Sequence, residues 1–148
     1  MDFQTMNKQR KLMLIFSLIG LIAMFLPWVR ISFLGMGTSV NGMHDMGIVI
    51  FICFLGCGLL SLAGKQDLAL DKSMWLISII LSGVAALIMI IFFFKSTDVM
   101  SFLSFGFYIA AIAALGLLFI AYQYRAPGYN IRDSFDELKK KVDNKSSN

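Results

Sequence analysis

The chain has 148 residues, of which 58% are hydrophobic and 15% charged, and its formal net charge is +4. Soluble domains are about 45–50% apolar and about 25% charged, and a small one has too little interior to bury this much apolar surface. The composition therefore excludes a soluble globule, a disordered tail and a nucleic-acid module. It indicates an integral membrane protein.

Four long runs without Asp, Glu, Lys, Arg or His follow one another along the chain. A transmembrane helix needs about 20 mostly apolar residues, with a range of roughly 17–25. The sequence therefore predicts an all-α integral membrane protein, an antiparallel bundle of four transmembrane helices. The predicted spans are 12–28, 47–64, 74–94 and 105–124. They make a membrane domain over 1–126, followed by a cytoplasmic tail over 127–148.

Basic residues are unequally divided between the two sides of the predicted bundle. Of the 13 Lys and Arg residues, only Arg30 and Lys95 lie in the loops after the first and third spans. Cytoplasmic loops carry the excess of basic residues. Both termini are therefore predicted to be cytoplasmic, in a plasma membrane or, in a bacterium, the inner membrane. Trp28 and Trp75, at opposite ends of the spans, are predicted to anchor the chain at the membrane interfaces.

The loop after the first span has the pattern of a short β-hairpin. Val29, Ile31 and Phe33 alternate with polar residues and lead into a Gly-x-Gly sequence that starts at Gly35. Alternation around a glycine turn is typical of two paired strands. We expect an extracytoplasmic hairpin, and an irregular loop is the alternative.

Pro27-Trp28-Val29-Arg30 resembles the cluster that ends the first helix of claudin-type tetraspan proteins. In that family the cluster leads into an extracellular β-segment, so the resemblance implies the same arrangement here. The chain departs from the family in its shorter loop, which lacks the Gly-Leu-Trp motif and the paired loop cysteines. Its two cysteines, Cys53 and Cys57, lie within the second span instead. The resemblance is one of architecture and implies no activity.

Small residues recur at four-residue spacing in three of the spans. Such stripes let transmembrane helices approach closely, so we expect them to pack helices within the bundle or against a second subunit. The predicted packing residues are Cys53, Cys57 and Ser61, then Ser78, Ser82 and Ala86, then Gly106, Ala110 and Ala114. For the two cysteines, packing is preferred to thiol chemistry because their helical spacing disfavours a disulfide.

The tail contains an amphipathic pattern over about 130–142. Its apolar positions recur at helical spacing and are Ile131, Phe135, Leu138 and Val142. Its basic residues include Lys139, Lys140 and Lys141. This pattern predicts a helix on the cytoplasmic leaflet that is attracted to anionic lipid headgroups, with Ser134 and Glu137 as a capping box. A docking helix for a cytoplasmic partner and a solvated tail are the alternatives.

The predicted spans hold no ionisable group of the kind on which proton relays and coupled transporters depend. The sequence also shows no catalytic set, phosphate-binding loop or metal-ligand cluster, so we expect no enzyme activity and no cofactor. The leading hypothesis is a polytopic membrane protein that acts through assembly, as a structural, accessory or regulatory subunit. It would be a homo-oligomer or bind a partner membrane protein. An oligomeric pore or channel is the first alternative, and a membrane-sited immunity or sensing protein is the second.

Overall fold

The computed structural model describes residues 6–33, 36–44, 46–95, 103–125, 128 and 130–146. Within these ranges the chain is mostly helical, with one small antiparallel sheet of two strands. The elements in chain order are α1 (Lys8–Phe25), β1 (Pro27–Phe33), β2 (Met36–Asn41), α2 (Gly47–Leu62), α3 (Lys72–Lys95), α4 (Phe105–Gln123) and α5 (Ile131–Ser146).

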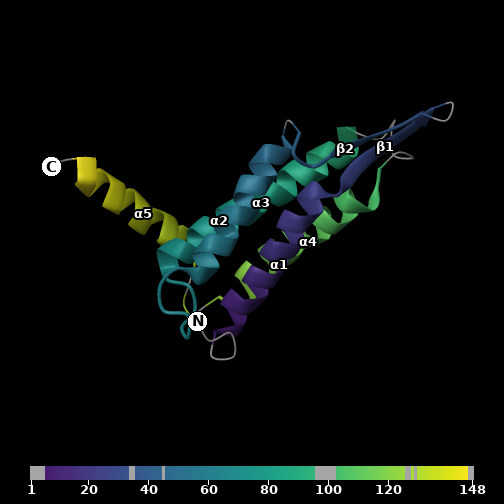
Figure 1. The fold of residues 1–148 in the computed structure, drawn as a ribbon. Helices are drawn as coiled ribbons and strands as arrows, with labels where there is room; N and C mark the ends of the chain where they lie inside the picture. The colour runs from purple at the N-terminus through teal and green to yellow at the C-terminus, as the bar shows by residue number, and fades with distance from the viewer. Residues whose placement is uncertain are drawn as a thin grey trace.

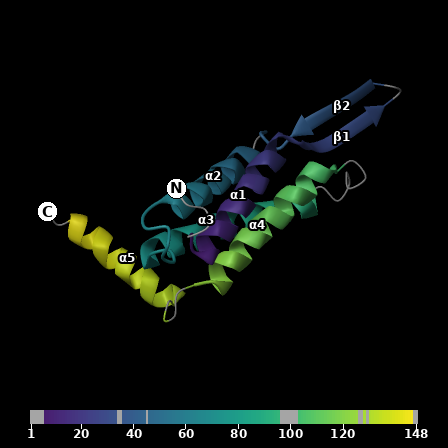
Figure 2. The same ribbon diagram turned by 60° about the horizontal axis from the view of Figure 1, so that its bottom comes forward.

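The first four helices form a bundle. Each packs against its neighbour in the chain, and α1 also packs against α4, which closes the bundle. Figures 1 and 2 show the β-hairpin extending beyond one end of the helices, whereas α5 leaves the bundle at the opposite end. Two helices, α3 and α4, are long and apolar enough to cross a membrane. The helix α2 is apolar but shorter, and α1 includes three basic residues in its first turn.

The first helix ends earlier than the apolar run that predicted it. The run continues to Trp28, but α1 ends at Phe25 and Leu26 is already extended. The cause is Pro27, because a proline disfavours the helical conformation at the residue before it and has no N–H to donate. Trp28 therefore belongs to β1 and not to the first helix. The other three helices begin and end within two residues of the predicted spans.

The predicted hairpin is confirmed. The strands β1 and β2 pair antiparallel from Pro27 opposite Asn41 to Phe33 opposite Met36, and the turn at 34–35 lies outside the described residues. The base of the hairpin is tied to the start of α4, since the backbone N–H of Ser104 donates to the carbonyl of Trp28 at 2.7 Å. The hairpin is thereby fixed to two helices of the bundle.

The bundle has large apolar side chains on its outside and many small ones inside. Each of the four helices exposes large aliphatic residues, with exposed fractions of 57–65% for Ile22, Leu59, Leu87 and Ile112. The interior includes the fully buried Ala110, Ala113 and Ala114 of α4. Helices of soluble bundles turn a polar face outward. In this bundle the outward faces of the helices carry large apolar side chains instead.

Candidate functional site

All nine residues of the predicted small-residue stripes are buried. The polar groups of Cys57, Ser61, Ser78 and Ser82 have partners within the bundle. The Cys57 thiol donates to the Ser78 carbonyl at 3.8 Å and links α2 to α3. The hydroxyls of Ser61 and Ser82 donate to backbone carbonyls one turn earlier in their own helices, at 2.8 and 2.7 Å. The three stripes are therefore occupied by packing within a single chain.

The Gly106→Ala variant is expected to destabilise the bundle by about 1–3 kcal/mol, the usual effect of overpacking. A methyl group at Gly106 would lie 2.7 Å from the Pro27 carbonyl oxygen and 2.8 Å from Leu26 Cβ, and neither atom moves without moving the backbone. The matched control is Gly83→Ala, because no atom lies within 4 Å of the added methyl. Thermal unfolding in detergent measures both variants, and equal melting temperatures would contradict the packing.

The two tryptophans predicted as interface anchors are buried inside the protein, which corrects that interpretation. Trp28 is 4% exposed and Trp75 is 1% exposed. The indole N–H of Trp28 donates to the Ala23 carbonyl at 3.0 Å, and that of Trp75 donates to the Ala121 carbonyl at 2.7 Å. Both N–H groups bond to backbone carbonyls, so the two rings are fixed inside the protein, one near each end of the bundle.

Arg10 has a structural role that its sequence position did not reveal. Only 1% of it is exposed. Its Nε donates to the Leu68 carbonyl at 2.7 Å, and its Nη1 donates to the Ala63 carbonyl. Longer contacts of 3.4 Å reach the carbonyls of Leu60 and Ser61 at the end of α2. The last carbonyls of a helix have no partner within the helix and attract cations, so Arg10 caps α2.

Residues next to Arg10 bind the segment that connects α2 to α3, to which Leu68 also belongs. The backbone N–H of Leu70 donates to Gln9 Oε1 at 3.2 Å, and the backbone N–H of Asn7 donates to the Gln66 carbonyl at 2.8 Å. We call Asn7, Gln9 and Arg10, together with the end of α2 and the connector that they contact at residues 60–70, the Arg10 clasp. It closes the end of the bundle that carries the N-terminus.

The tail helix α5 begins one residue later and ends four residues later than predicted. Its predicted capping box is wrong, because Ser134 lies inside the helix and its hydroxyl donates to the Asn130 carbonyl at 2.8 Å. Glu137 forms an ion pair with Lys72 of α3, with a Nζ–Oε2 distance of 2.8 Å. Among the apolar positions, Leu138 packs against the bundle, whereas Ile131, Phe135 and Val142 are exposed, as are Lys139, Lys140 and Lys141.

The contact between α5 and α3 is expected to weaken in acid. The hydrogen bond and charge of Lys72 hold the pKa of Glu137 below its ordinary value of 4.5, with smaller help from Lys141 and Lys140. A lowered folded-state pKa stabilises the contact above pH 4.5, and that contribution is lost as pH falls through the lowered pKa. Fluorescence transfer between labels on α3 and α5 should drop only in that range. The Lys72→Gln variant should show no such acid transition.

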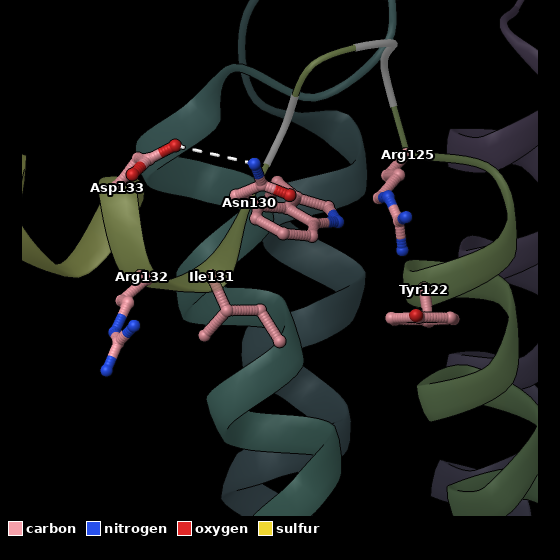
Figure 3. A pocket seen from close by; sticks show the side chains of 7 residues that line it. Tyr122, Arg125, Asn130, Ile131, Arg132 and Asp133 are labelled. Carbon is pink, nitrogen blue, oxygen red and sulfur yellow. Dashed lines mark hydrogen bonds between the residues drawn. The ribbon is translucent and has the colours of Figure 1, made fainter.

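A pocket of about 370 Å³, with a lining that is polar and apolar in equal parts, lies where α3 begins, α4 ends and α5 begins (Figure 3). Its lining includes Arg125, Arg132 and Asn130, and the Arg125 guanidinium stacks over the Tyr122 ring at 4.4 Å. The Asn130 side-chain N–H donates to Asp133 at 3.5 Å. We call this the junction pocket. No local sequence pattern predicts this pocket, because residues of three separate helices form it.

An apolar groove of about 400 Å³ adjoins the junction pocket along α3 and α4. The two share Tyr122 and Ile131 as lining residues. The other lining residues of the groove are Ile79, Leu115, Leu118 and Phe119. The two hollows therefore adjoin one another, and the lining becomes more apolar from the end of the bundle along its side.

The comparisons with known proteins are negative: no protein family, curated protein or solved structure matches the chain. Within the described part of the chain, no group of three or more His, Cys, Asp or Glu residues converges to hold a metal ion. Cys53 and Cys57 are buried free thiols. Function is therefore inferred from the surfaces and packing described above.

Proposed function

We propose that the chain is a non-enzymatic membrane protein with four spans that acts through assembly, as a structural, accessory or regulatory subunit. The observation that carries the proposal is the apolar outer surface of all four bundle helices around an interior rich in small residues. An apolar outer surface of this extent is unfavourable in water and favourable in lipid. In lipid no hydrophobic effect drives helices together, and small residues at the contacts let them pack closely instead.

Helix lengths are compatible with this placement. At about 1.5 Å per residue, the 24 residues of α3 extend about 36 Å and the 16 of α2 about 24 Å. The hydrocarbon layer is about 30 Å thick. A longer helix adapts by tilting, and a shorter one by local thinning, at fractions of a kcal/mol per Å. The short α2 is therefore no obstacle to a fourth span.

The distribution of basic residues supports one orientation. Lys8, Lys65 and Arg125 lie at the end of the bundle from which α5 leaves, whereas Arg30 lies in the hairpin at the other end. The positive-inside rule places the first group in the cytoplasm. Both termini and α5 are then cytoplasmic, and the hairpin is outside.

The two projecting elements, the hairpin and α5, are the proposed contact surfaces. A hollow of about 590 Å³ beside the hairpin is lined by residues that include Arg30, Ser39 and His44. The packing favours this role over a pore made by oligomerisation. Ser78 and Ser82 of α3, whose hydroxyls could otherwise line a pore, are buried and donate to backbone carbonyls of their own helix.

Native mass spectrometry of the protein in nanodiscs drawn directly from its host membrane tests the proposal. We expect a defined complex with a second membrane protein or a further copy. Placing negative charge on the exposed hairpin pair with Arg30→Glu and Ser39→Glu, which are opposite one another in the sheet, should dissociate it. Replacing the outward-facing Ile112 with Leu should not. A wild-type monomer without partners, or ion flux by the purified protein in liposomes, would overturn the proposal.

A further inference from the structure

The helix α5 contacts the bundle through one side and leaves an apolar side exposed. On the contacting side, Ser134 is buried, Glu137 forms its ion pair with α3 and Leu138 packs against the core. These positions share one side because residues three and four apart are neighbours on a helix. The adjacent side carries large apolar residues with exposed fractions of 47–65%. We call them the α5 stripe, and they are Ile131, Phe135 and Val142.

The charges of α5 are sorted by face. Residues seven apart point in nearly the same direction on a helix, so Arg132 and Lys139 lie together on one flank of the α5 stripe. At about 100° per residue, Lys141 lies on the other flank. Every acidic residue of α5 lies on the half of the helix away from the stripe. These residues are Asp133, Asp136, Glu137 and Asp143.

The position of α5 turns the stripe and its basic flanks toward the length of the bundle. Figures 1 and 2 both show α5 running across the bundle axis and not along it. In Figure 3, Ile131 and Arg132 point in the direction that leads from Arg125 to Tyr122 along α4, whereas Asp133 points the opposite way. The apolar and basic half of α5 therefore faces the side on which the bundle helices expose their apolar surface.

We propose that α5 lies flat on the cytoplasmic leaflet, with the α5 stripe at the level of the upper acyl chains and its basic flanks at anionic headgroups. Helices of this kind bury their apolar face about 5–10 Å into the boundary between headgroups and acyl chains. Long basic side chains beside the stripe extend outward to reach the headgroups. The inference rests on the proposed four-span placement, and it names an anionic leaflet as the partner of one of the two proposed contact surfaces.

The arrangement of charge favours a leaflet over a protein partner or a solvated tail. A leaflet is a plane of anionic headgroups above apolar chains, so it meets the stripe and both basic flanks at once. A helix of 16 residues is marginally stable alone in water, and its contact with α3 covers only one side. Burial of the stripe in the leaflet supplies further stabilisation, and the ion pair between Lys72 and Glu137 already holds the helix near the surface.

The test is fluorescence quenching of the full-length protein in nanodiscs of phosphatidylcholine with added phosphatidylglycerol. A fluorophore is attached to Val142→Cys on the stripe or, as the matched control, to Lys140→Cys, which lies seven residues after Asp133 and shares its face. We expect nitroxide groups on lipid acyl chains to quench the label at 142 and dissolved iodide to quench the label at 140. The native cysteines are buried and stay unlabelled.

Charge variants test the basic flanks. Lys139→Gln and Lys140→Gln remove the same charge from neighbouring exposed residues, but only Lys139 flanks the stripe. Lys139→Gln should lower the ratio of lipid-protected to iodide-accessible label at 142 about fivefold. The ratio is measured at the phosphatidylglycerol content that half-protects the label without the glutamine. Lys140→Gln should lower it less than about twofold, because its charge lies about a Debye length further from the headgroups.

Three results would overturn the inference. They are equal iodide quenching of the labels at 142 and 140, equal effects of the two glutamine variants, or protection at 142 from iodide without quenching by lipid, which indicates a second copy of the chain on the stripe. Alkaline extraction of the same proteins measures membrane integration. A protein that is extracted removes the proposed function itself, whereas an integrated protein with an iodide-accessible stripe removes only the surface placement of α5.

Discussion

The Arg10→Ala variant should lower the free energy of unfolding by about 3 kcal/mol, since a hydrogen bond to a charged group contributes roughly 1.5–3 kcal/mol and Arg10 makes at least two short ones. The truncation leaves the carbonyls of Ala63 and Leu68 without their partner. It also removes the cation from the carboxyl end of α2, where the helix dipole favours positive charge. The connector between α2 and α3 should loosen.

Two further variants separate this role from the effect of charge on membrane orientation. Lys8→Ala removes a basic residue from the same helix turn, but Lys8 is exposed, so stability should change by less than about 0.5 kcal/mol. Arg10→Lys keeps the charge, yet an ammonium group cannot reproduce the planar fork of donors, so it should recover only part of the loss. Thermal unfolding in detergent and trypsin cleavage at Lys65 measure the effect. Equal behaviour of Arg10→Ala and Lys8→Ala would show that the clasp does not hold the connector.

The Ile112→Asp variant should reduce the membrane-integrated fraction of the protein severely. Ile112 lies on the outer face of α4 near the helix centre and is 65% exposed. A charged residue at the centre of a membrane helix costs about 2.5–3.5 kcal/mol on insertion scales. In a soluble protein the same exposed substitution would change stability by less than about 0.5 kcal/mol. The result therefore distinguishes lipid from water as the surroundings of this face.

The matched control for that experiment is Gln123→Asp, which places the same charge on the same helix at its exposed end. A carboxylate there reaches the headgroup region, so integration should be close to that of the wild type. Alkaline extraction of membranes, with the pellet and supernatant quantified, provides the measurement. Full recovery of Ile112→Asp in the membrane pellet would contradict the placement of α4.

The sequence predicted the features that depend on neighbouring residues. Apolar runs gave the helix positions, the alternation beginning at Val29 gave the hairpin, and the spacing from Ile131 to Val142 gave α5. Local rules also explain the main error in helix bounds, because Pro27 stops α1 before Trp28. The periodicity of the tail correctly predicted the helix α5. The predicted capping box was wrong, since Glu137 forms an ion pair with Lys72 on α3.

Features formed by distant segments were not predictable in this way. In the sequence, Arg10 is one of the basic residues that predict the orientation of the chain in the membrane. Its structural role could not be predicted, because its hydrogen-bond partners lie 50 or more residues away in the chain. Trp28 and Trp75 have the residue type and the sequence position of interface anchors. Packing between helices nevertheless buries both of them. The junction pocket needs the positions of α3, α4 and α5 relative to one another, and no local pattern encodes them.

The most direct test of the four-span bundle is cysteine labelling with a membrane-impermeant maleimide in intact and permeabilised cells. The native Cys53 and Cys57 are buried, so the wild type serves as the unlabelled background. Ser39→Cys on the hairpin should react in intact cells, whereas Lys140→Cys on α5 and Lys65→Cys in the connector should react only after permeabilisation. Reaction of the hairpin and the connector from the same side would contradict the account.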